Sequence, residues 1–114
     1  MHVKRWKVEY WDGLRTKSSI EKWFLGLPKD QFKSVAKEIK ILEQIGNELK
    51  LPHSRALGKG LFELRERRYG LRIYYAFHDL QLIVLLAVGN KTSQERDIKI
   101  ARERLFILSG GQKK

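Results

Sequence analysis

The stretch GLFELRERRYGLRIYY, residues 60–75, decides the fold because apolar and charged side chains alternate on both sides of a central turn. In its first half, apolar residues alternate with Glu63, Arg65 and Arg67, which predicts a strand with one apolar face and one charged face. The turn covers residues 68–70 and ends in glycine. We therefore predict two antiparallel strands joined by this turn.

Arginines occur four times in this stretch, more than a strand pair needs for one polar face. In the second half, Ile73 and Tyr75 alternate with Arg72 and Tyr74, so the charged side chains of both strands share one face. Lys91 follows the next apolar strand directly, at the end of that strand in the same sheet. We expect helices to cover the apolar face and these cations to converge on an opposite, open and concave face.

The remaining elements follow from hydrophobic periodicity on either side of this hairpin. Alternation over residues 3–11 predicts a first strand, and LIVLLAV at residues 82–88 predicts a central one. A short helix begins at a capping box of Ser18 and Glu21 and ends before Pro28. The other predicted helices run from Asp30 to Gly46, and from a capping box of Thr92 and Glu95 to Leu108.

These elements follow the order β-α-α-β-β-β-α, which is typical of an α+β fold. We expect an antiparallel sheet packed against two N-terminal helices and a C-terminal helix. The 114 residues are predicted to form a single domain, residues 1–114. Nothing in the pattern indicates an internal repeat or a linker between domains.

The composition narrows the possible partners and sites. Lys and Arg number 24 against 13 Asp and Glu, a net charge of +11 that favours nucleic acid, an anionic membrane surface or an acidic protein. The absence of cysteine excludes disulfides and thiol chemistry, and three histidines without ligand spacing predict no metal site. With no signal peptide and no apolar run approaching ~20 residues, we expect a cytoplasmic protein without a membrane partner.

The charged face suits phosphate, because the planar guanidinium of arginine donates paired hydrogen bonds and stays ionised at cellular pH. Tyrosines at 69, 74 and 75 offer stacking surfaces for unpaired bases. The alternative is an ordinary solvated sheet face, on which Glu63 and Glu66 pair locally with the arginines.

Four segments carry a resemblance to a known family: LGKGLFELRE, YGLRIYY, LIVLLAVGNKT and DIKIARERL, within residues 57–105. They resemble the RelE/ParE superfamily of bacterial toxins, and within it the HigB-type, phage Gp49-like branch. The resemblance implies a RelE-like fold and the toxin of a type II toxin–antitoxin system. It implies a metal-independent endoribonuclease without a cofactor, which cleaves mRNA on the ribosome and so inhibits translation. The expected partner is a small helix-turn-helix antitoxin encoded next to it.

The resemblance also assigns roles to single positions. Arg65, Arg72 and Lys91 match catalytic cations, and the expected RNA-binding residues are Lys59, Arg67, Arg68 and Tyr74. Glu63 stands where RelE has a lysine, and Asp97 where RelE has a catalytic tyrosine, so the general base stays open among Glu63, His78 and His53. Two other functions remain open: a ParE-like inhibitor of DNA gyrase, and a non-catalytic basic RNA-binding module.

Overall fold

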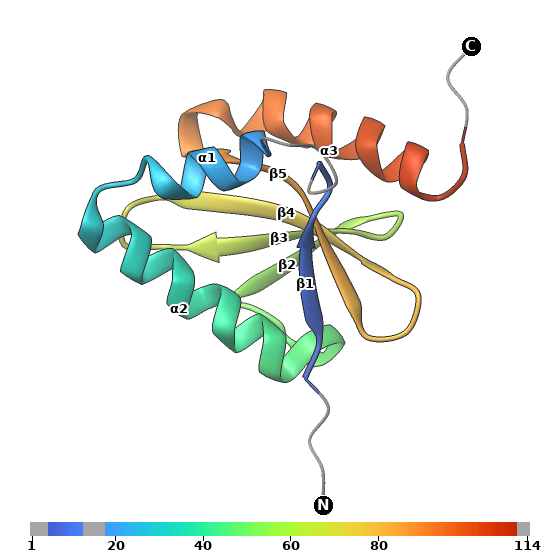
Figure 1. Ribbon diagram of the computed structural model, residues 1–114, viewed down its shortest axis with the longest axis horizontal. Helices are drawn as coiled ribbons and strands as arrows, with labels where there is room; N and C mark the ends of the chain where they lie inside the picture. Colours follow the sequence, from blue (N-terminus) through green and yellow to red (C-terminus); the bar gives the residue numbers. More distant parts are fainter. Residues whose placement is uncertain (1–4, 13–17, 112–114) are drawn as a thin grey trace, which may run out of the picture.

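The computed structural model describes residues 5–12 and 18–111, which form an α+β fold (Figure 1). The chain runs through β1 (Lys7–Tyr10), α1 (Ser19–Leu25), α2 (Lys29–Ile45), β2 (Ser54–Gly58), β3 (Leu61–Glu66), β4 (Leu71–His78), β5 (Leu82–Asn90) and α3 (Gln94–Leu108). Two 3-10 turns, η1 (Gly46–Glu48) and η2 (Lys91–Ser93), follow α2 and precede α3. Residues 3 and 4 of the predicted first strand lie outside the described residues.

The described strands form one sheet in the order β1-β5-β4-β3-β2. The predicted hairpin of β3 and β4 is confirmed, with Leu64 opposite Ile73. Two expectations were wrong. The sheet is mixed, because β1 pairs parallel with β5, whereas the other neighbours are antiparallel. The order also contains an additional strand, β2, which was missed because SRALG is largely exposed at the sheet edge and shows no alternation.

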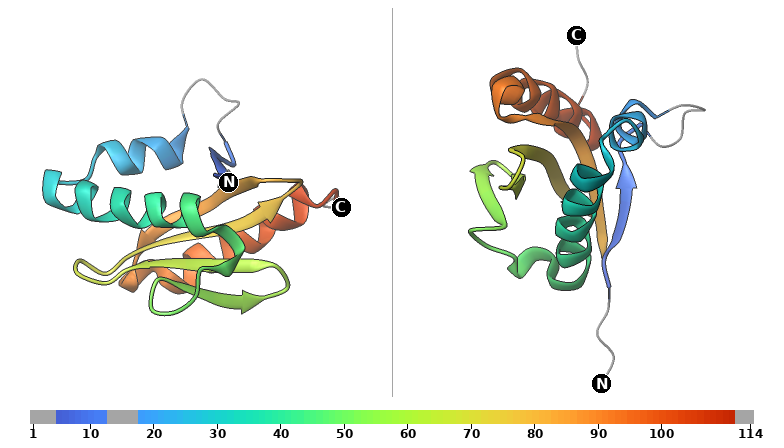
Figure 2. Two further views of the ribbon diagram at one scale, coloured as in Figure 1. Left: turned by 90° about the horizontal axis from the view of Figure 1, so that it is seen from below. Right: turned by 90° about the vertical axis from the view of Figure 1, so that its left-hand side faces the viewer.

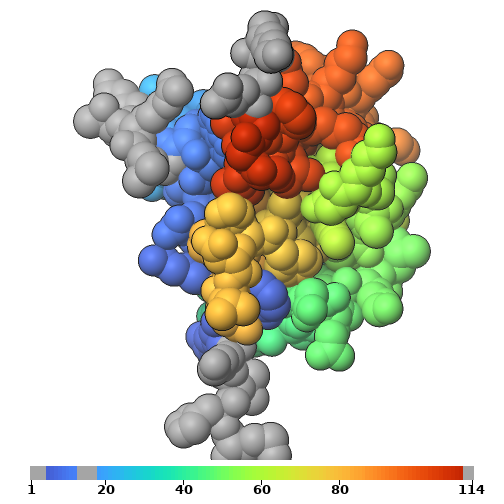
Figure 3. Space-filling model, turned by 90° about the vertical axis from the view of Figure 1, so that its right-hand side faces the viewer, coloured from blue at the N-terminus to red at the C-terminus, as the bar shows by residue number. Residues whose placement is uncertain are grey.

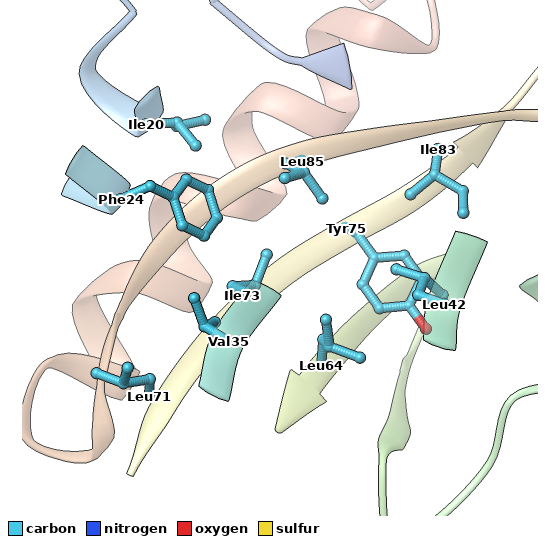
Figure 4. Packing of buried hydrophobic residues seen from close by; sticks show 10 residues of the cluster. All are labelled: Ile20, Phe24, Val35, Leu42, Leu64, Leu71, Ile73, Tyr75, Ile83 and Leu85. Carbon is cyan, nitrogen blue, oxygen red and sulfur yellow. The ribbon is translucent and has the colours of Figure 1, made fainter. Parts of the chain in front are cut away.

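Helices cover both faces of the sheet, which makes three layers (Figure 2). Against α1 and α2 lies the main core, whose side chains interlock as Figure 4 shows: Ile20, Phe24, Val35, Leu42, Leu64, Leu71, Ile73, Tyr75, Ile83 and Leu85. The opposite face packs against α3 through a second cluster that contains Leu61, Tyr74, Ala76, Leu86 and Ala101. Successive side chains of β3 and β4 point to opposite faces of the sheet, so each of these strands contributes residues to both cores.

Local residues set the ends of the helices. Ser18 accepts a hydrogen bond from the Glu21 amide at 3.1 Å, which confirms Ser18 as the cap of α1. Gly46 has a φ of +62° and passes so close to Trp6 that a Cβ would overlap the indole ring, so only glycine fits at the end of α2. None of the helices among the described residues is long and apolar enough to cross a membrane.

The predicted cap of the last helix was wrong in detail. Its box does not join Thr92 and Glu95, since the side chain of Asn90 accepts from the amides of Thr92 and Ser93 at 2.9 and 3.1 Å. The Ser93 hydroxyl in turn accepts from the Asn90 amide at 3.1 Å. The reciprocal bonds fix η2 at the end of β5, with the cap two residues earlier than the sequence pattern indicates.

Candidate active site

Two arginines lie directly opposite each other on β3 and β4, because the strand register pairs Arg65 with Arg72. Like charges at such a cross-strand position destabilise a sheet unless an anion compensates them. The compensating anion is Glu63, two residues before Arg65 on the same face of β3. The hairpin alone therefore brings together two of the predicted catalytic cations and one carboxylate.

Glu63 is fully buried, and both of its carboxylate oxygens accept hydrogen bonds. One oxygen accepts from Nη1 of Arg72 at 3.0 Å and also lies 3.9 Å from Nε of Arg65. The other accepts from Nε2 of Gln94, in the first turn of α3, at 2.8 Å. Gln94 was not predicted from the sequence, because only the packing of α3 on the sheet places it there. Glu63 thus holds Arg72 in position and is not a free base.

The charged face of the hairpin is not open, contrary to the expectation from the alternation. Helix α3 lies across it, and Ala101 packs in the cluster that contains Leu61 and Tyr74. Tyr74 is fully buried, so the proposed contact between this ring and RNA bases is wrong. Burial, and next the neighbouring Glu63 carboxylate, raise the pKa of Tyr74.

The end of this face near the β3–β4 turn is accessible. There a cavity of about 290 Å³ is lined by Arg65, Glu66, Arg67, Gly70, Arg72 and Lys91, and we call it the arginine hollow. The Arg72 side chain is 12% exposed and the Arg65 side chain 30% exposed, and Lys91 and Arg67 are exposed, so Arg72 is the most buried of the lining cations. Four of the six lining residues are cations, which makes the hollow suited to an anion such as phosphate.

Lys91 reaches the arginine hollow through η2. Its amide donates to the carbonyl of Gly70 at 3.0 Å, which ties the start of η2 to the β3–β4 turn. The structure therefore brings Arg65, Arg72 and Lys91 to one cavity, although they come from β3, β4 and the segment after β5. All three were singled out from the sequence.

The β3–β4 turn is held by Glu66, which does not pair with the arginines as one interpretation of the sequence suggested. Its buried carboxylate accepts from the amides of Arg68 and Tyr69 at 3.1 and 2.9 Å, and from the Ser34 hydroxyl of α2 at 2.6 Å. These bonds shape the turn that carries Arg67 and Arg68, both of which are exposed. The role of Glu66 depends on α2 and could not be seen in the hairpin sequence alone.

We expect Glu66→Gln to lower the free energy of unfolding by about 1–3 kcal/mol, because an amide group cannot accept from all the donors that surround the carboxylate. Urea denaturation measures the loss. The control is Glu48→Gln, on an exposed residue of η1, for which a change within about 0.5 kcal/mol is expected. Equal stabilities for the two variants would contradict the proposed role of Glu66 in the turn.

Two of the predicted residues lie far from the arginine hollow. Lys59 is in the β2–β3 turn, six positions before Arg65, which corresponds to about 20 Å of extended chain. His78 ends β4, six residues from Arg72, and pairs with Asp79 at 3.4 Å. In Figure 1 the β3–β4 turn lies on the left, whereas the turns that follow β2 and β4 lie on the right, the side that faces the viewer in Figure 3.

His53 comes closer but points to the other face. Its carbonyl accepts from the Arg65 amide at 2.8 Å, whereas its ring nitrogen Nδ1 lies 2.8 Å from the Glu38 carboxylate of α2. Asp97, for which the resemblance to RelE implied the place of a tyrosine, is buried and accepts from the Ser93 hydroxyl at 2.5 Å. Neither side chain therefore lines the arginine hollow.

No group of three or more His, Asp or Glu side chains among residues 5–12 and 18–111 is arranged to hold a metal ion. The ionisable groups that do gather are the cations of the arginine hollow, with Glu63 behind them. Such a site can bind and stabilise negative charge, since its guanidinium groups are held before any ligand arrives.

Comparison with known proteins places this geometry in a family. No curated protein matches the chain. A family model described as phage derived protein Gp49-like (DUF891) matches residues 22–114, which include β2–β5, α3 and the whole arginine hollow. The family is of the RelE-like toxin type and suggests a toxin with an antitoxin partner. The chain therefore belongs to the Gp49-like family of phage-derived proteins.

Proposed function

We propose that this protein is the toxin of a type II toxin–antitoxin system and acts as a ribosome-dependent endoribonuclease of the HigB type on mRNA. One observation carries the proposal: Arg72 is held 3.0 Å from a buried carboxylate at the base of the arginine hollow, beside Arg65 and Lys91. Membership of a RelE-like toxin family supports the class of activity.

RNA cleavage without a metal proceeds by attack of the 2′-hydroxyl on the adjacent phosphate. Negative charge accumulates on the phosphorane oxygens in the transition state, and the 5′-oxygen leaves. In the proposed mechanism Arg72 faces this charge, and Arg65 and Lys91 add to the stabilisation from the walls of the hollow. Because Glu63 already fixes Arg72, little reorganisation is needed when the charge develops.

We assign charge stabilisation, not proton transfer, to these residues. An arginine guanidinium has a pKa far above neutral and is a poor acid or base. Of the three candidates named from the sequence, Glu63 has both oxygens occupied, and the side chains of His53 and His78 lie outside the hollow. In this proposal the exposed Arg67 and Arg68 bind the RNA backbone next to the scissile phosphate.

Expression of the toxin without its antitoxin is expected to stop translation before it stops DNA synthesis. Pulse labelling with methionine and thymidine in the same culture measures both rates. The Arg72→Ala variant is the control, and cells that express it should continue to incorporate methionine. An early fall in thymidine incorporation with methionine incorporation maintained would favour a ParE-like gyrase inhibitor instead.

The antitoxin is proposed to be a small helix-turn-helix protein that covers the arginine hollow with acidic side chains. The +11 charge of the chain favours such a partner, because complementary charge speeds association and selects the interface. We expect a neighbour-encoded protein to co-purify with the toxin and to abolish its toxicity. A neighbour that binds but leaves RNA cleavage intact would contradict coverage of the hollow.

A further inference from the structure

A second cavity lies beside the arginine hollow, between α1 and the start of α3, and we call it the Trp23 hollow. Its volume is about 740 Å³, within the ~300–1,000 Å³ range of small-molecule sites. Figure 2, right, shows the end of β5 passing between α1 and α3 on this side of the molecule. The lining residues that matter here are Trp23, Asn90, Thr92, Glu95, Arg96 and Lys99.

The side chains of the Trp23 hollow combine an aromatic ring with cations. Trp23 is half-buried, with its indole edge-on to Phe24 at a centroid distance of 5.1 Å, so the core holds the ring while part of it remains accessible. Arg96 and Lys99 are exposed on α3, one helical turn apart on the same side. A ring for stacking beside cations for phosphate is the combination that binds unpaired nucleotides.

The Trp23 hollow and the arginine hollow share η2 as their common wall. Lys91 lines the arginine hollow, whereas its neighbours Asn90 and Thr92 line the Trp23 hollow. The Asn90 side chain binds the Thr92 and Ser93 amides, and the Lys91 amide binds the carbonyl of Gly70, so this wall is fixed. The two hollows are therefore neighbours on either side of η2, so adjacent nucleotides of one RNA strand can occupy both.

We propose that the Trp23 hollow is a binding subsite for a nucleotide next to the scissile phosphate, with its base stacked on Trp23 and its phosphate bound by Arg96 and Lys99. The proposal rests on the proposed function for the identity of the ligand as RNA. Two carboxylates lie near these cations, since Glu95 lines the same hollow and Asp97 lies 3.7 Å from Nε of Arg96. The Arg96 side chain is nevertheless 75% exposed and accessible to a phosphate. The subsite selects unpaired RNA, because a base inside a duplex cannot stack on the ring.

The test is direct binding of a fluorescein-labelled 2′-fluoro RNA heptamer, which lacks the attacking 2′-hydroxyl and is not cleaved. Trp23→Leu, which keeps an apolar side chain against Phe24, is expected to weaken binding about 5- to 150-fold, the range for loss of one stacked base. The matched control is Phe106→Leu, on an exposed aromatic residue far along α3, and it should bind as the wild type does.

An abasic nucleotide moved along the heptamer then locates the contact. With the wild-type protein, an abasic nucleotide at one position should weaken binding. With Trp23→Leu, the abasic nucleotide at that position should have no further effect, because the stacking contact has already been removed. Identical losses at every position in both proteins would overturn the proposal. If Trp23→Leu does not fold, Trp23→Phe takes its place, with a smaller but position-specific loss expected.

The phosphate contacts are tested separately by salt dependence. Affinity for RNA falls as salt rises. In the double variant Arg96→Ala/Lys99→Ala this fall should be shallower: the negative slope of log affinity against log salt should shrink by about 1.4, or about 0.7 for each lost contact to single-stranded RNA. The control is Lys33→Ala/Lys37→Ala, on the exposed side of α2. An unchanged slope in the α3 variant would overturn the assignment of these two residues.

These binding results are independent of cleavage. If the wild type binds RNA through Trp23 yet never cuts mRNA on ribosomes, the subsite stands and the proposed function fails. If Trp23→Leu binds and cuts as the wild type does, the subsite fails and the proposed function stands.

Discussion

Arg72→Ala and Arg72→Lys are both expected to bind ribosomes and to lose most of the single-turnover cleavage of mRNA. Arg72→Ala should also lose stability, because Glu63 stays buried without its partner at 3.0 Å, so cleavage is measured where circular dichroism shows the variant folded. Removal of one preorganised donor to a developing oxyanion slows a reaction by about 10²–10³, or about 3–4 kcal/mol. Lysine keeps the charge but lacks the planar fork that Glu63 orients through Nη1, so we expect it to rescue little. Quenched-flow cleavage on programmed ribosomes at saturating toxin measures the bound-state rate.

Lys59→Ala is the matched control, since it removes a cation at the far end of β3, outside the arginine hollow. We expect it to cleave at close to the wild-type rate once binding is saturated. Lys91→Ala and Arg65→Ala should have intermediate effects, in that order of severity. Both residues line the hollow, but Lys91 is exposed, and Arg65 lies 3.9 Å from the Glu63 carboxylate whereas Arg72 lies 3.0 Å from it. The assignment is falsified if folded Arg72→Ala cuts at a near wild-type rate.

Glu63→Leu is expected to lower the free energy of unfolding by about 3–5 kcal/mol, the range for breaking a buried ion pair from one side. The substitution leaves the largely buried Arg72 without its counter-ion, and it also removes the acceptor of Gln94. A leucine of similar size fills the space, so the loss measures the unpaired charge and not a cavity. Urea denaturation with linear extrapolation gives the value.

The double variant Glu63→Leu/Arg72→Met separates the ion pair from packing. Removing both charges should recover much of the stability that Glu63→Leu loses, because no uncompensated cation remains in the core. The exposed pair of Lys7 and Glu9 provides a contrast, and Glu9→Gln should change stability by less than about 1 kcal/mol. Additive effects of the two substitutions would contradict a coupled pair. The double variant should fold but not cleave.

Much of this fold can be derived from local hydrophobic periodicity in the sequence alone. The alternation around residues 60–75 identified β3, β4 and their turn, and it placed Arg65 and Arg72 on one face. Lys91 was found as the first cation after an apolar strand, where the chain leaves the sheet. A strand has a period of two whatever packs on it, so the side of each residue can be derived from the sequence.

The tertiary structure decided which faces are covered and which strands are neighbours. Periodicity distinguishes the two sides of a strand but does not say that α3 lies across the charged side, so Tyr74 and Glu63 were expected to be accessible and are buried. The parallel pairing of β1 with β5 and the edge strand β2 depend on contacts between distant segments, which leave no local pattern. For the same reason Gln94 and Glu66 acquire their roles only when α3 and α2 pack on the sheet, since each role consists of hydrogen bonds that include partners distant in sequence.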